Sequence, residues 1–587
     1  MGTNRGRLID GGTLLLLGLL AALLYHHSLS SFWIYDDPYI LRHAFDWSPW
    51  QYFFVPSVWR ELTIRYFTPL VTLSFDLDLA LGGLEPQFFY LHQLLAIWLV
   101  SSALYVTLRL WVTRAFALYG SLFFLVSAPV AAASEMLQIR HYVEGLSFCL
   151  LSFYFFTLAV RRNSMPLGVG AAACYLLSAL AKELYVPLVI PLLLLPEGSL
   201  RNRLVLGLPA VAALFLYAVL RYWMLGDVVA GPGETSLFAA YHGPSAFLTL
   251  AHDVYGAFVM ATGLFRAVKP VAPVIAIATA ALSCLALGAL IARARYGMCL
   301  FFIALTAMVF AVPLSVFQPS NVAHDFPAYR LVFLLAAYFA FVIPLSAYFL
   351  DRDVASMPAL GFLTRLLTPV LLLIIASVAL SSRQWIAAER EITIRPLAEE
   401  GRFFMSGDTT ALLVKRDPLN GGTHYFENLA FFREHLRGDS PPAVAYRGFV
   451  FPDEPDPPEL RGRRAFSYDP AQRSLAEITP DYPGVRGKLL SSLSEGPLSV
   501  DLTVKSGLIS FTLGPAEKGR YFVLWGHRPG FYSMMIDLGA LRSLKTRGLT
   551  RLKVYWRFGW ESPEGLITLS PEWFVDFAQE TEISWKR

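Results

Sequence analysis

The sequence predicts a mainly helical membrane protein: a polytopic bundle of about eleven transmembrane helices, followed by a soluble α+β domain rich in β-strands. Of the 587 residues, 55% are hydrophobic and only 16% are charged, which is typical of polytopic membrane proteins. Apolar segments recur up to about residue 381, and short alternating stretches replace them from about residue 400. We therefore expect a transmembrane domain over residues 1–390 and an extracytoplasmic β-rich domain over residues 391–587.

The first predicted span covers residues 13–32. This run is long for the apolar core of a signal peptide, and no small-residue cleavage site follows it before Asp36. The four cysteines all fall inside predicted spans, so we expect them to be packing residues and not disulfides or metal ligands. Further spans are expected at about 88–110, 115–133, 145–160, 166–181, 183–196, 204–222, 271–292, 297–317, 330–350 and 361–381.

Basic residues flank these segments on alternate sides, and the positive-inside rule makes the richer side cytoplasmic. That side receives Arg5, Arg7, Arg109, Arg114, Arg161, Arg162, Arg201, Arg203, Arg293, Arg295 and Arg352. The pattern indicates a multi-pass protein with a cytoplasmic N-terminus and an extracytoplasmic C-terminal domain, and we expect it in a bacterial inner (plasma) membrane. The net charge of +4 is small and says nothing about nucleic acid, and we expect no nucleic-acid partner. The other side receives the loops 33–87, 134–144, 223–270 and 318–329 and the tail from residue 382.

The tail alternates apolar and polar residues with a period of two, which predicts an antiparallel sheet or a small sandwich. A helix is expected near residues 424–437, and the Pro- and Asp-rich run 451–458 reads as a loop. The alternating apolar positions are Leu498, Val500, Leu502 and Val504; Ile509, Phe511 and Leu513; Tyr521, Val523 and Trp525; and Leu552, Val554 and Trp556.

An acidic pair, Asp36-Asp37, follows the first predicted span. Adjacent carboxylates at a membrane boundary are costly unless water, a cation or a reacting group compensates them, so they are functional candidates. A solvated loop, or a helix cap before Pro38, is the alternative.

Most other unusual polar residues fall on the same outer side. Cations and carboxylates that converge there suit an anionic lipid head group with a reacting hydroxyl beside it, because Arg and Lys hold phosphate and a carboxylate accepts a hydroxyl proton. Taken singly, the cations could instead be interfacial anchors, Lys182-Glu183 a self-neutralising pair, and the carboxylates solvating groups of a turn. The residues are Asp46, Glu61, Arg65, Asp76, Asp78, Glu135, Gln138, Arg140, His141, Glu144, Lys182, Glu183, Arg221 and Arg330.

Several short motifs resemble the GT-C superfamily of multi-spanning glycosyltransferases, in particular its protein O-mannosyltransferase-like branch that includes the transmembrane and tetratricopeptide-repeat proteins. The similarity runs over residues 10–390, and a β-rich tail stands where that branch has its repeats. Phe67-Thr68 departs from the single Arg that usually precedes the Pro-Leu pair. The motifs, in order, are Tyr35-Asp36-Asp37, Tyr66-Phe67-Thr68-Pro69-Leu70, Ala181-Lys182-Glu183, Leu220-Arg221-Tyr222, Tyr329-Arg330 and Arg383-Gln384-Trp385.

The resemblance implies a hexosyltransferase that moves a sugar, with inversion, from a polyprenyl-phosphate donor to an acceptor hydroxyl on the non-cytoplasmic face. The acceptor would be a protein or a glycan of the cell envelope. The resemblance implies that the base is Asp36 or Asp37; we favour Asp36, with Asp37 orienting it or contacting a metal. No cofactor is required, although a divalent cation is compatible. Glu135 and Glu144 are then candidates for a second acidic site, and Arg140, His141, Lys182, Arg221 and Arg330 for donor-phosphate ligands.

Two other functions are compatible with many spans. A lipid-linked saccharide transporter or flippase would carry charges near the bilayer midplane, whereas here they cluster at one face. A membrane-anchored assembly protein would need far fewer spans.

Overall fold

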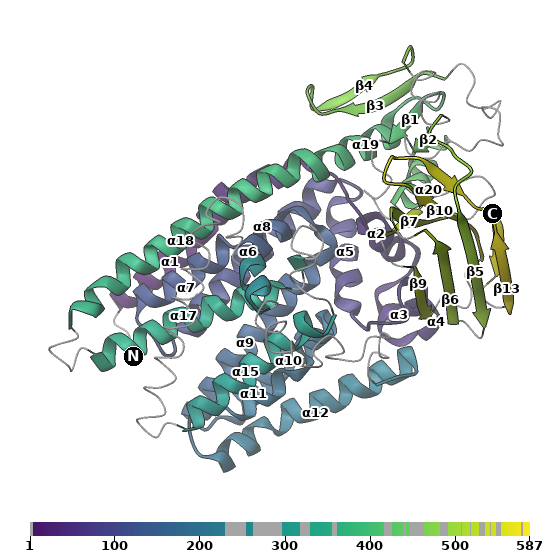
Figure 1. Ribbon diagram of the computed structural model, residues 1–587. Coiled ribbons are helices and arrows are strands. Elements are labelled where there is room, and N and C mark those ends of the chain that lie inside the picture. Colours follow the sequence, from purple (N-terminus) through teal and green to yellow (C-terminus); the bar gives the residue numbers. More distant parts are fainter. Residues whose placement is uncertain are drawn as a thin grey trace. The chain divides into compact units, whose positions relative to one another are not determined.

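The computed structural model divides the chain into two units, which are described separately (Figure 1). The first contains Met1–Ser31 and His43–Arg390, and the second contains Phe32–Arg42 and Glu391–Arg587. The segment Phe32–Arg42, expected within the transmembrane domain, thus groups with the C-terminal unit. The structure describes residues 4–228, 254–261, 296–316, 329–330, 332–354, 361–415, 425–439, 442–446, 463–481, 491–505, 508–516, 518–526, 534–539, 542–547, 553–576 and 579–587.

The first unit is helical. Proline opens many of its helices, because the first helical position needs no N–H and favours the φ of proline; Pro49, Pro56, Pro69 and Pro86 are examples. The described helices are α1 (Asn4–Tyr25), η1 (His26–Ser30), α3 (Pro49–Phe54), α4 (Pro56–Leu62), α5 (Pro69–Gly82), α6 (Pro86–Leu108), α7 (Arg114–Leu125), α8 (Ala128–Glu135), η2 (Leu137–Ile139), α9 (Arg140–Arg162), α10 (Met165–Ala181), η3 (Glu183–Leu188), α11 (Val189–Leu193), α12 (Leu200–Leu225), α15 (Tyr296–Val316), α17 (Phe333–Val354) and α18 (Gly361–Glu389), with α2 (Asp37–Asp46) shared between the units.

Within the described residues, 5 helices are long and apolar enough to cross a membrane, or up to 6 if a bent pair counts as one span. The expected count of about eleven is therefore not confirmed, and the expected span 271–292 lies outside the described residues. The long helices cover Gly6–Ser30, Pro86–Leu108, Leu137–Arg162, Leu200–Leu225 and Pro369–Ser406.

Proline explains where the expected spans are broken. The pair α7 and α8 is bent by 52°, and Pro129 is the second residue of α8, in its first turn. The expected span 183–196 consists of η3, which contains Pro187, and the short α11. Proline removes a hydrogen-bond donor and clashes with the preceding turn, so a regular helix does not continue through it.

Several of the basic residues that flank the predicted spans meet at one end of the helical unit. Arg114 Nε lies 2.8 Å from Asp10 Oδ1, which joins the start of α7 to α1. Arg161 pairs with Glu197 at 2.6 Å and also donates to the carbonyl of Leu110. These contacts bring together the flanks that sequence analysis assigned to the cytoplasmic side.

The second unit contains a small parallel arrangement that the sequence analysis missed. Strands β1 (Leu412–Lys415) and β2 (Ala443–Tyr446) pair in parallel, and α20 (Tyr425–Arg437) connects them. Strand β3 (Ala465–Asp469) pairs in parallel on the other side of β1, and β4 (Ser474–Glu477) completes the order β2-β1-β3-β4. The other helix of this unit, α19, covers Arg395–Ser406.

Of the two predicted alternatives, a single antiparallel sheet or a small sandwich, the described strands form the sandwich, because two sheets share one hydrophobic core. One sheet has the order β13-β5-β6-β9, and the other has β11-β10-β7-β8 with β12 beside β10. The apolar positions of β5 alternate with its polar ones, and Leu498, Val500, Leu502 and Val504 are all buried. The strands are β5 (Leu498–Lys505), β6 (Leu508–Pro515), β7 (Arg520–Gly526), β8 (Met534–Gly539), β9 (Ser543–Arg547), β10 (Lys553–Glu561), β11 (Ile567–Leu569), β12 (Trp573–Asp576) and β13 (Thr581–Lys586).

The described part of the tail also confirms the expected helix, because α20 covers most of residues 424–437. The expected loop 451–458 and the position Leu552 lie outside the described residues.

Candidate functional site

The acidic pair lies where the chain turns into α2. Tyr35 has a φ of 50°, a left-handed conformation that residues with a side chain rarely adopt and that concentrates at functional sites. The backbone carbonyl of Asp36 accepts from the N–H groups of Tyr39 and Ile40. The carboxylate of Asp37 accepts from the N–H of Ile34 at 2.9 Å.

The two carboxylates differ in environment. Asp36 is exposed, whereas Asp37 is fully buried. Burial raises the pKa of the nearby Tyr425 phenol, and the charges of Glu400 and Asp37 act in the same direction. Asp37 thus holds the turn in place, and Asp36 presents its carboxylate at the start of the helix.

The segment around this pair packs within the second unit. The hydroxyl of Tyr425 donates to the carbonyl of Trp33 at 2.8 Å. Arg42 lies over the ring of Phe431, with 4.4 Å between the guanidinium carbon and the ring centre. Contacts with α20 therefore fix both ends of the turn that carries Asp36.

Glu135 is enclosed in the first unit. Its carboxylate is 0% exposed and lies 3.0 Å from His27 Nε2 and 3.3 Å from Arg390 Nε. The hydroxyl of Ser31 donates to its other oxygen at 3.0 Å. This carboxylate ties α8 to the end of the first span and to Arg390, and it has no surface open to a ligand.

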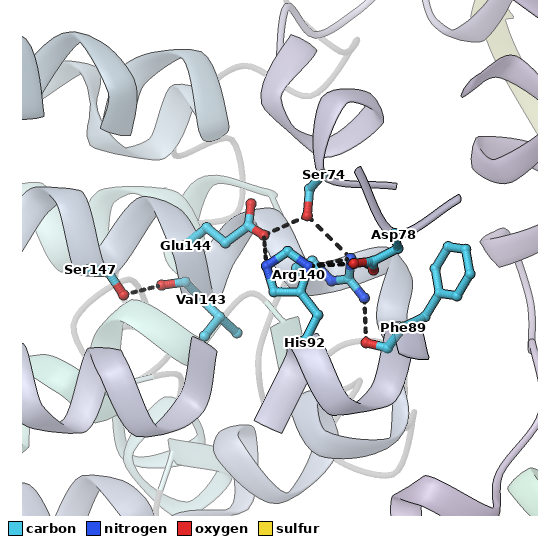
Figure 2. Close-up of polar contacts among 8 residues, drawn as sticks. All are labelled: Ser74, Asp78, Phe89, His92, Arg140, Val143, Glu144 and Ser147. Carbon is cyan, nitrogen blue, oxygen red and sulfur yellow. Dashed lines mark hydrogen bonds and ion pairs between the residues drawn. The ribbon is translucent and has the colours of Figure 1, made fainter. Parts of the chain in front are cut away.

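Arg140, at the start of α9, is also fully buried. Its guanidinium donates to the carboxylate of Asp78, to the hydroxyl of Ser74 at 3.2 Å and to the carbonyl of Phe89 at 2.5 Å (Figure 2). Because its side chain is inaccessible, Arg140 is placed to hold α5 and α6 against α9 and not to contact a donor phosphate.

Glu144 is one helical turn beyond Arg140, on the same face of α9. The hydroxyl of Ser74 donates to Glu144 Oε1 at 2.6 Å, and His92 Nε2 lies 3.6 Å from that oxygen. The Glu144 side chain is 15% exposed. Of the two candidates for a second acidic site, Glu144 is the one with an accessible surface.

Arg221, near the end of α12, is also held in a buried ion pair. Its guanidinium lies 3.0 Å from Glu183, and its side chain is only 4% exposed. Glu183 also accepts from the N–H of Phe67 at 2.8 Å and from the hydroxyl of Tyr217 at 3.2 Å. This network joins the start of α5 to α12 through Glu183.

Lys182 is different, because no carboxylate of the described residues pairs with its ammonium. Its Nζ lies 4.5 Å from the ring centre of Tyr66 and 4.9 Å from that of Tyr142. Two aromatic faces stabilise the cation without neutralising it. The side chain is half-buried, so the charge remains accessible.

His141 and Arg330 lie near this lysine. The imidazole of His141 lies within electrostatic range of both Lys182 and Arg330. Among the described residues, Nδ1 of His141 is buried without a hydrogen-bond partner and Arg330 has no carboxylate partner. We call Lys182, His141 and Arg330 the cationic site.

An aromatic stack holds the backbone beside Arg330. The ring centres of Tyr329 and Trp385 are 4.0 Å apart and their planes are 28° from parallel. Tyr329 is 0% exposed and Trp385 is 1% exposed. Since Tyr329 precedes Arg330 in the chain, the stack on α18 fixes where the Arg330 side chain begins.

Five predicted phosphate ligands thus separate into two groups. The cationic site brings together His141, Lys182 and Arg330, whereas Arg140 and Arg221 are buried in ion pairs. Sequence reasoning missed His92 as a site residue, although a polar residue within an apolar segment is a recognisable signal. It also missed that Tyr66 and Tyr142 flank Lys182.

The described residues contain no group of three or more His, Cys, Asp or Glu side chains that could hold a metal ion. Around Asp78, His92 and Glu144, the guanidinium of Arg140 occupies the position where a cation would compensate the carboxylates. We derive no step through a metal ion.

No protein-family model and no curated protein matches the chain. Among solved structures, it is similar to the Archaeoglobus fulgidus oligosaccharyltransferase in complex with Zn and sulfate, with 13% identity, a TM-score of 0.41, and coverage of 74% of this chain and 62% of that chain. It is also similar to the archaeal oligosaccharyltransferase AglB from Archaeoglobus fulgidus in complex with an inhibitory peptide and a dolichol-phosphate, with 12% identity, a TM-score of 0.44, and coverage of 93% and 76%.

A third similar structure is ArnT from Cupriavidus metallidurans bound to undecaprenyl phosphate, with 14% identity, a TM-score of 0.37, and coverage of 74% of this chain and 90% of that chain. The chain thus spans 62% of the length of the first of these structures. With TM-scores of 0.37–0.44, these likenesses carry no argument about activity. Any inference about activity therefore rests on the residues of the chain itself.

Proposed function

We propose that this protein is a GT-C-type membrane glycosyltransferase. It transfers a hexose, with inversion, from a polyprenyl-phosphate donor to a hydroxyl of a protein or glycan acceptor on the extracytoplasmic face. The observation that carries the proposal is the cationic site, where no carboxylate of the described residues pairs with Lys182 or Arg330 and His141 lies within electrostatic range of both. A membrane-bound anion is the natural partner of such charges, and Lys and Arg are the side chains that bind phosphate.

The cationic site also fits the chemistry of the transfer. When the glycosidic bond breaks, negative charge grows on the leaving phosphate while the sugar ring becomes cationic. Fixed cations beside that phosphate act where the charge develops, so they stabilise the transition state more than the bound donor. A monophosphate leaving group can be neutralised by Lys182 and Arg330 alone.

Asp36 is our proposed general base. In an inverting transfer one carboxylate accepts the proton of the acceptor hydroxyl as that oxygen attacks the sugar, and no covalent intermediate forms. Asp36 is exposed and directly precedes α2, and Asp37 is buried and accepts from the N–H of Ile34. Asp37 is therefore assigned to orient the turn.

The remaining predicted residues take supporting roles in this proposal. Arg140, Arg221 and Glu135 hold helices together through buried ion pairs.

The cations and carboxylates stand at helix ends: Arg140 begins α9, Lys182 follows α10 and Glu135 ends α8. A transporter with charges at the bilayer midplane is therefore less well supported than an enzyme acting at one membrane face.

Replacing Lys182 with Met should weaken binding of a polyprenyl-phosphate sugar about 10- to 100-fold, since a hydrogen bond to a charged group contributes about 1.5–3 kcal/mol. Met keeps the length and the apolar contact with the two tyrosine rings, so folding should be preserved. Binding to purified protein in nanodiscs measures the effect.

The matched control for Lys182→Met is Arg162→Met, which removes an exposed cation at the last position of α9. This control should bind the donor like the wild type. Equal affinities of wild type and Lys182→Met would remove the phosphate assignment.

Replacing Trp385 with Phe should raise the KM for the donor about 2- to 10-fold, because an aromatic pair contributes about 0.5–1.5 kcal/mol beyond its buried area. If the stack acts only by positioning Arg330, the same change should have no further effect in an Arg330→Ala background. The control is Trp111→Phe, whose ring contacts Phe341 instead. Additive effects of Trp385→Phe and Arg330→Ala would contradict the positioning role.

A further inference from the structure

The cluster in Figure 2 consists of Ser74, Asp78, His92, Arg140 and Glu144. The proposed transfer assigns no role to its accessible carboxylate, that of Glu144. In Glu144, only Oε1 contacts Ser74 and His92. No hydrogen bond joins Oε2 to any other described residue. Glu144 and His92 are also the accessible members of the cluster, with side-chain exposures of 15% and 28%.

The other charged side chains of the cluster are already paired with one another. Nδ1 of His92 lies 2.7 Å from Asp78 Oδ1 and 3.3 Å from Arg140 Nη1. Asp78 also accepts from Arg140, which neutralises it. Asp78 therefore fixes the His92 ring, and Glu144 is the carboxylate left to accept a hydrogen bond from outside the protein.

The surroundings of His92 indicate how a ligand would approach. On α6, the side chains of Phe88, Leu91 and Leu95 near His92 are 48%, 46% and 45% exposed. Exposed apolar side chains in a membrane-spanning helix suit lipid tails. A polar group set among them suits the head of an amphiphile.

We propose that Glu144 and His92 form a subsite for the hydroxyl groups of the sugar carried by the lipid-linked donor. This inference rests on the proposed function and deepens it. A carboxylate accepts hydrogen bonds from sugar hydroxyls but repels a phosphate, so this subsite recognises the sugar and the cationic site recognises the phosphate. His92, whose ring is held by Asp78, lines the same subsite, with its Nε2 3.6 Å from Glu144 Oε1.

The test compares two ligands on the purified, full-length protein: bare polyprenyl phosphate, and polyprenyl phosphates that carry hexoses or pentoses. The wild type should bind at least one glycosylated lipid more tightly than the bare lipid. Glu144→Gln should weaken binding of that lipid about 10- to 100-fold, because it removes a hydrogen bond to a charged acceptor. Its affinity for bare polyprenyl phosphate should change less than about twofold.

The matched control is Glu85→Gln, which alters an exposed carboxylate just before α6. Ser147→Ala is a second control on α9, since the Ser147 hydroxyl contacts only the carbonyl of Val143 in Figure 2. Both controls should keep the preference for the glycosylated lipid. Thermal unfolding of all variants separates loss of binding from loss of fold.

Three results would contradict the inference in different ways. If the wild type binds the bare and glycosylated lipids equally, or if Glu144→Gln weakens both equally, the sugar subsite is wrong and the cationic site stands. If Glu144→Gln affects only the KM for the acceptor, the hydroxyls recognised belong to the acceptor. If the wild type binds neither lipid, the proposed function itself fails.

Discussion

Replacing Asp36 with Asn is expected to reduce turnover about 10²- to 10⁴-fold, the contribution typical of a general base. Asn keeps the size of the side chain but cannot accept the hydroxyl proton. Donor binding should be nearly unchanged, because the donor is held by the cationic site. The measurement is transfer of radiolabel from a polyprenyl-phosphate sugar by the purified variant.

This substitution also separates catalysis from helix capping. Asn caps helices about as well as Asp, so a residue that merely caps α2 would lose less than about 1 kcal/mol of stability and no turnover. Asp46→Asn, at the other end of α2, is the matched control and should keep wild-type turnover. Asp37→Asn should reduce turnover less than Asp36→Asn if Asp37 only orients the turn. Wild-type turnover in both Asp36→Asn and Asp37→Asn would end the assignment of this pair.

The second large effect concerns stability. Replacing Arg140 with Met should lower the free energy of unfolding by about 3–5 kcal/mol, because it leaves Asp78 buried without its compensating charge. The Arg140 side chain is 0% exposed and that of Asp78 is 5% exposed, so water cannot replace the lost contact. Chemical denaturation in mixed micelles measures the change.

A double variant tests the reason for this loss. Replacing Arg140 with Met and Asp78 with Leu together removes both charges, and it should recover most of the stability. Arg114→Met removes a partly exposed pair with Asp10, whose side chains are 40% and 33% exposed. That variant should lose no more than about 1 kcal/mol. If Arg114→Met and Arg140→Met lose a comparable free energy of unfolding, burial of the ion pair is not the cause of the loss in Arg140→Met.

The sequence was most predictive where one local pattern decides the structure. The period-two alternation of Leu498, Val500, Leu502 and Val504 places these side chains on one face of β5, and they are buried in the sandwich. The parallel strands β1 and β2 have only four residues each. Strands that short show no clear alternation, so nothing local distinguishes them from loops.

Long-range pairing explains most of what the sequence analysis missed. Phe32–Arg42 follows the first span directly, and its contact with α20 joins Trp33 to Tyr425, 392 residues apart. Arg140 and Asp78 are 62 residues apart. A sequence shows that charges are present on one side of the membrane, but the fold decides which charges neutralise each other. Arg140, Arg221 and Lys182 therefore looked equivalent, and only Lys182 proves to lack a carboxylate partner among the described residues.

The i, i+4 spacings offered a partial signal for the cluster of Figure 2. Ser74 and Asp78 share one face of α5, and Arg140 and Glu144 share one face of α9. Each pair was visible in the sequence, but the meeting of α5 with α9 was not. His92 completes the cluster from α6, and no local pattern links it to either pair.

The most direct test of the proposed transfer reaction is a density map of the protein with a bound polyprenyl-phosphate donor. Our account predicts the phosphate within hydrogen-bonding distance of Lys182 Nζ and the Arg330 guanidinium, with His141 beside it. A phosphate bound instead among Arg109, Arg114 and Arg161, at the end of the helical unit where the basic flanks meet, would contradict it.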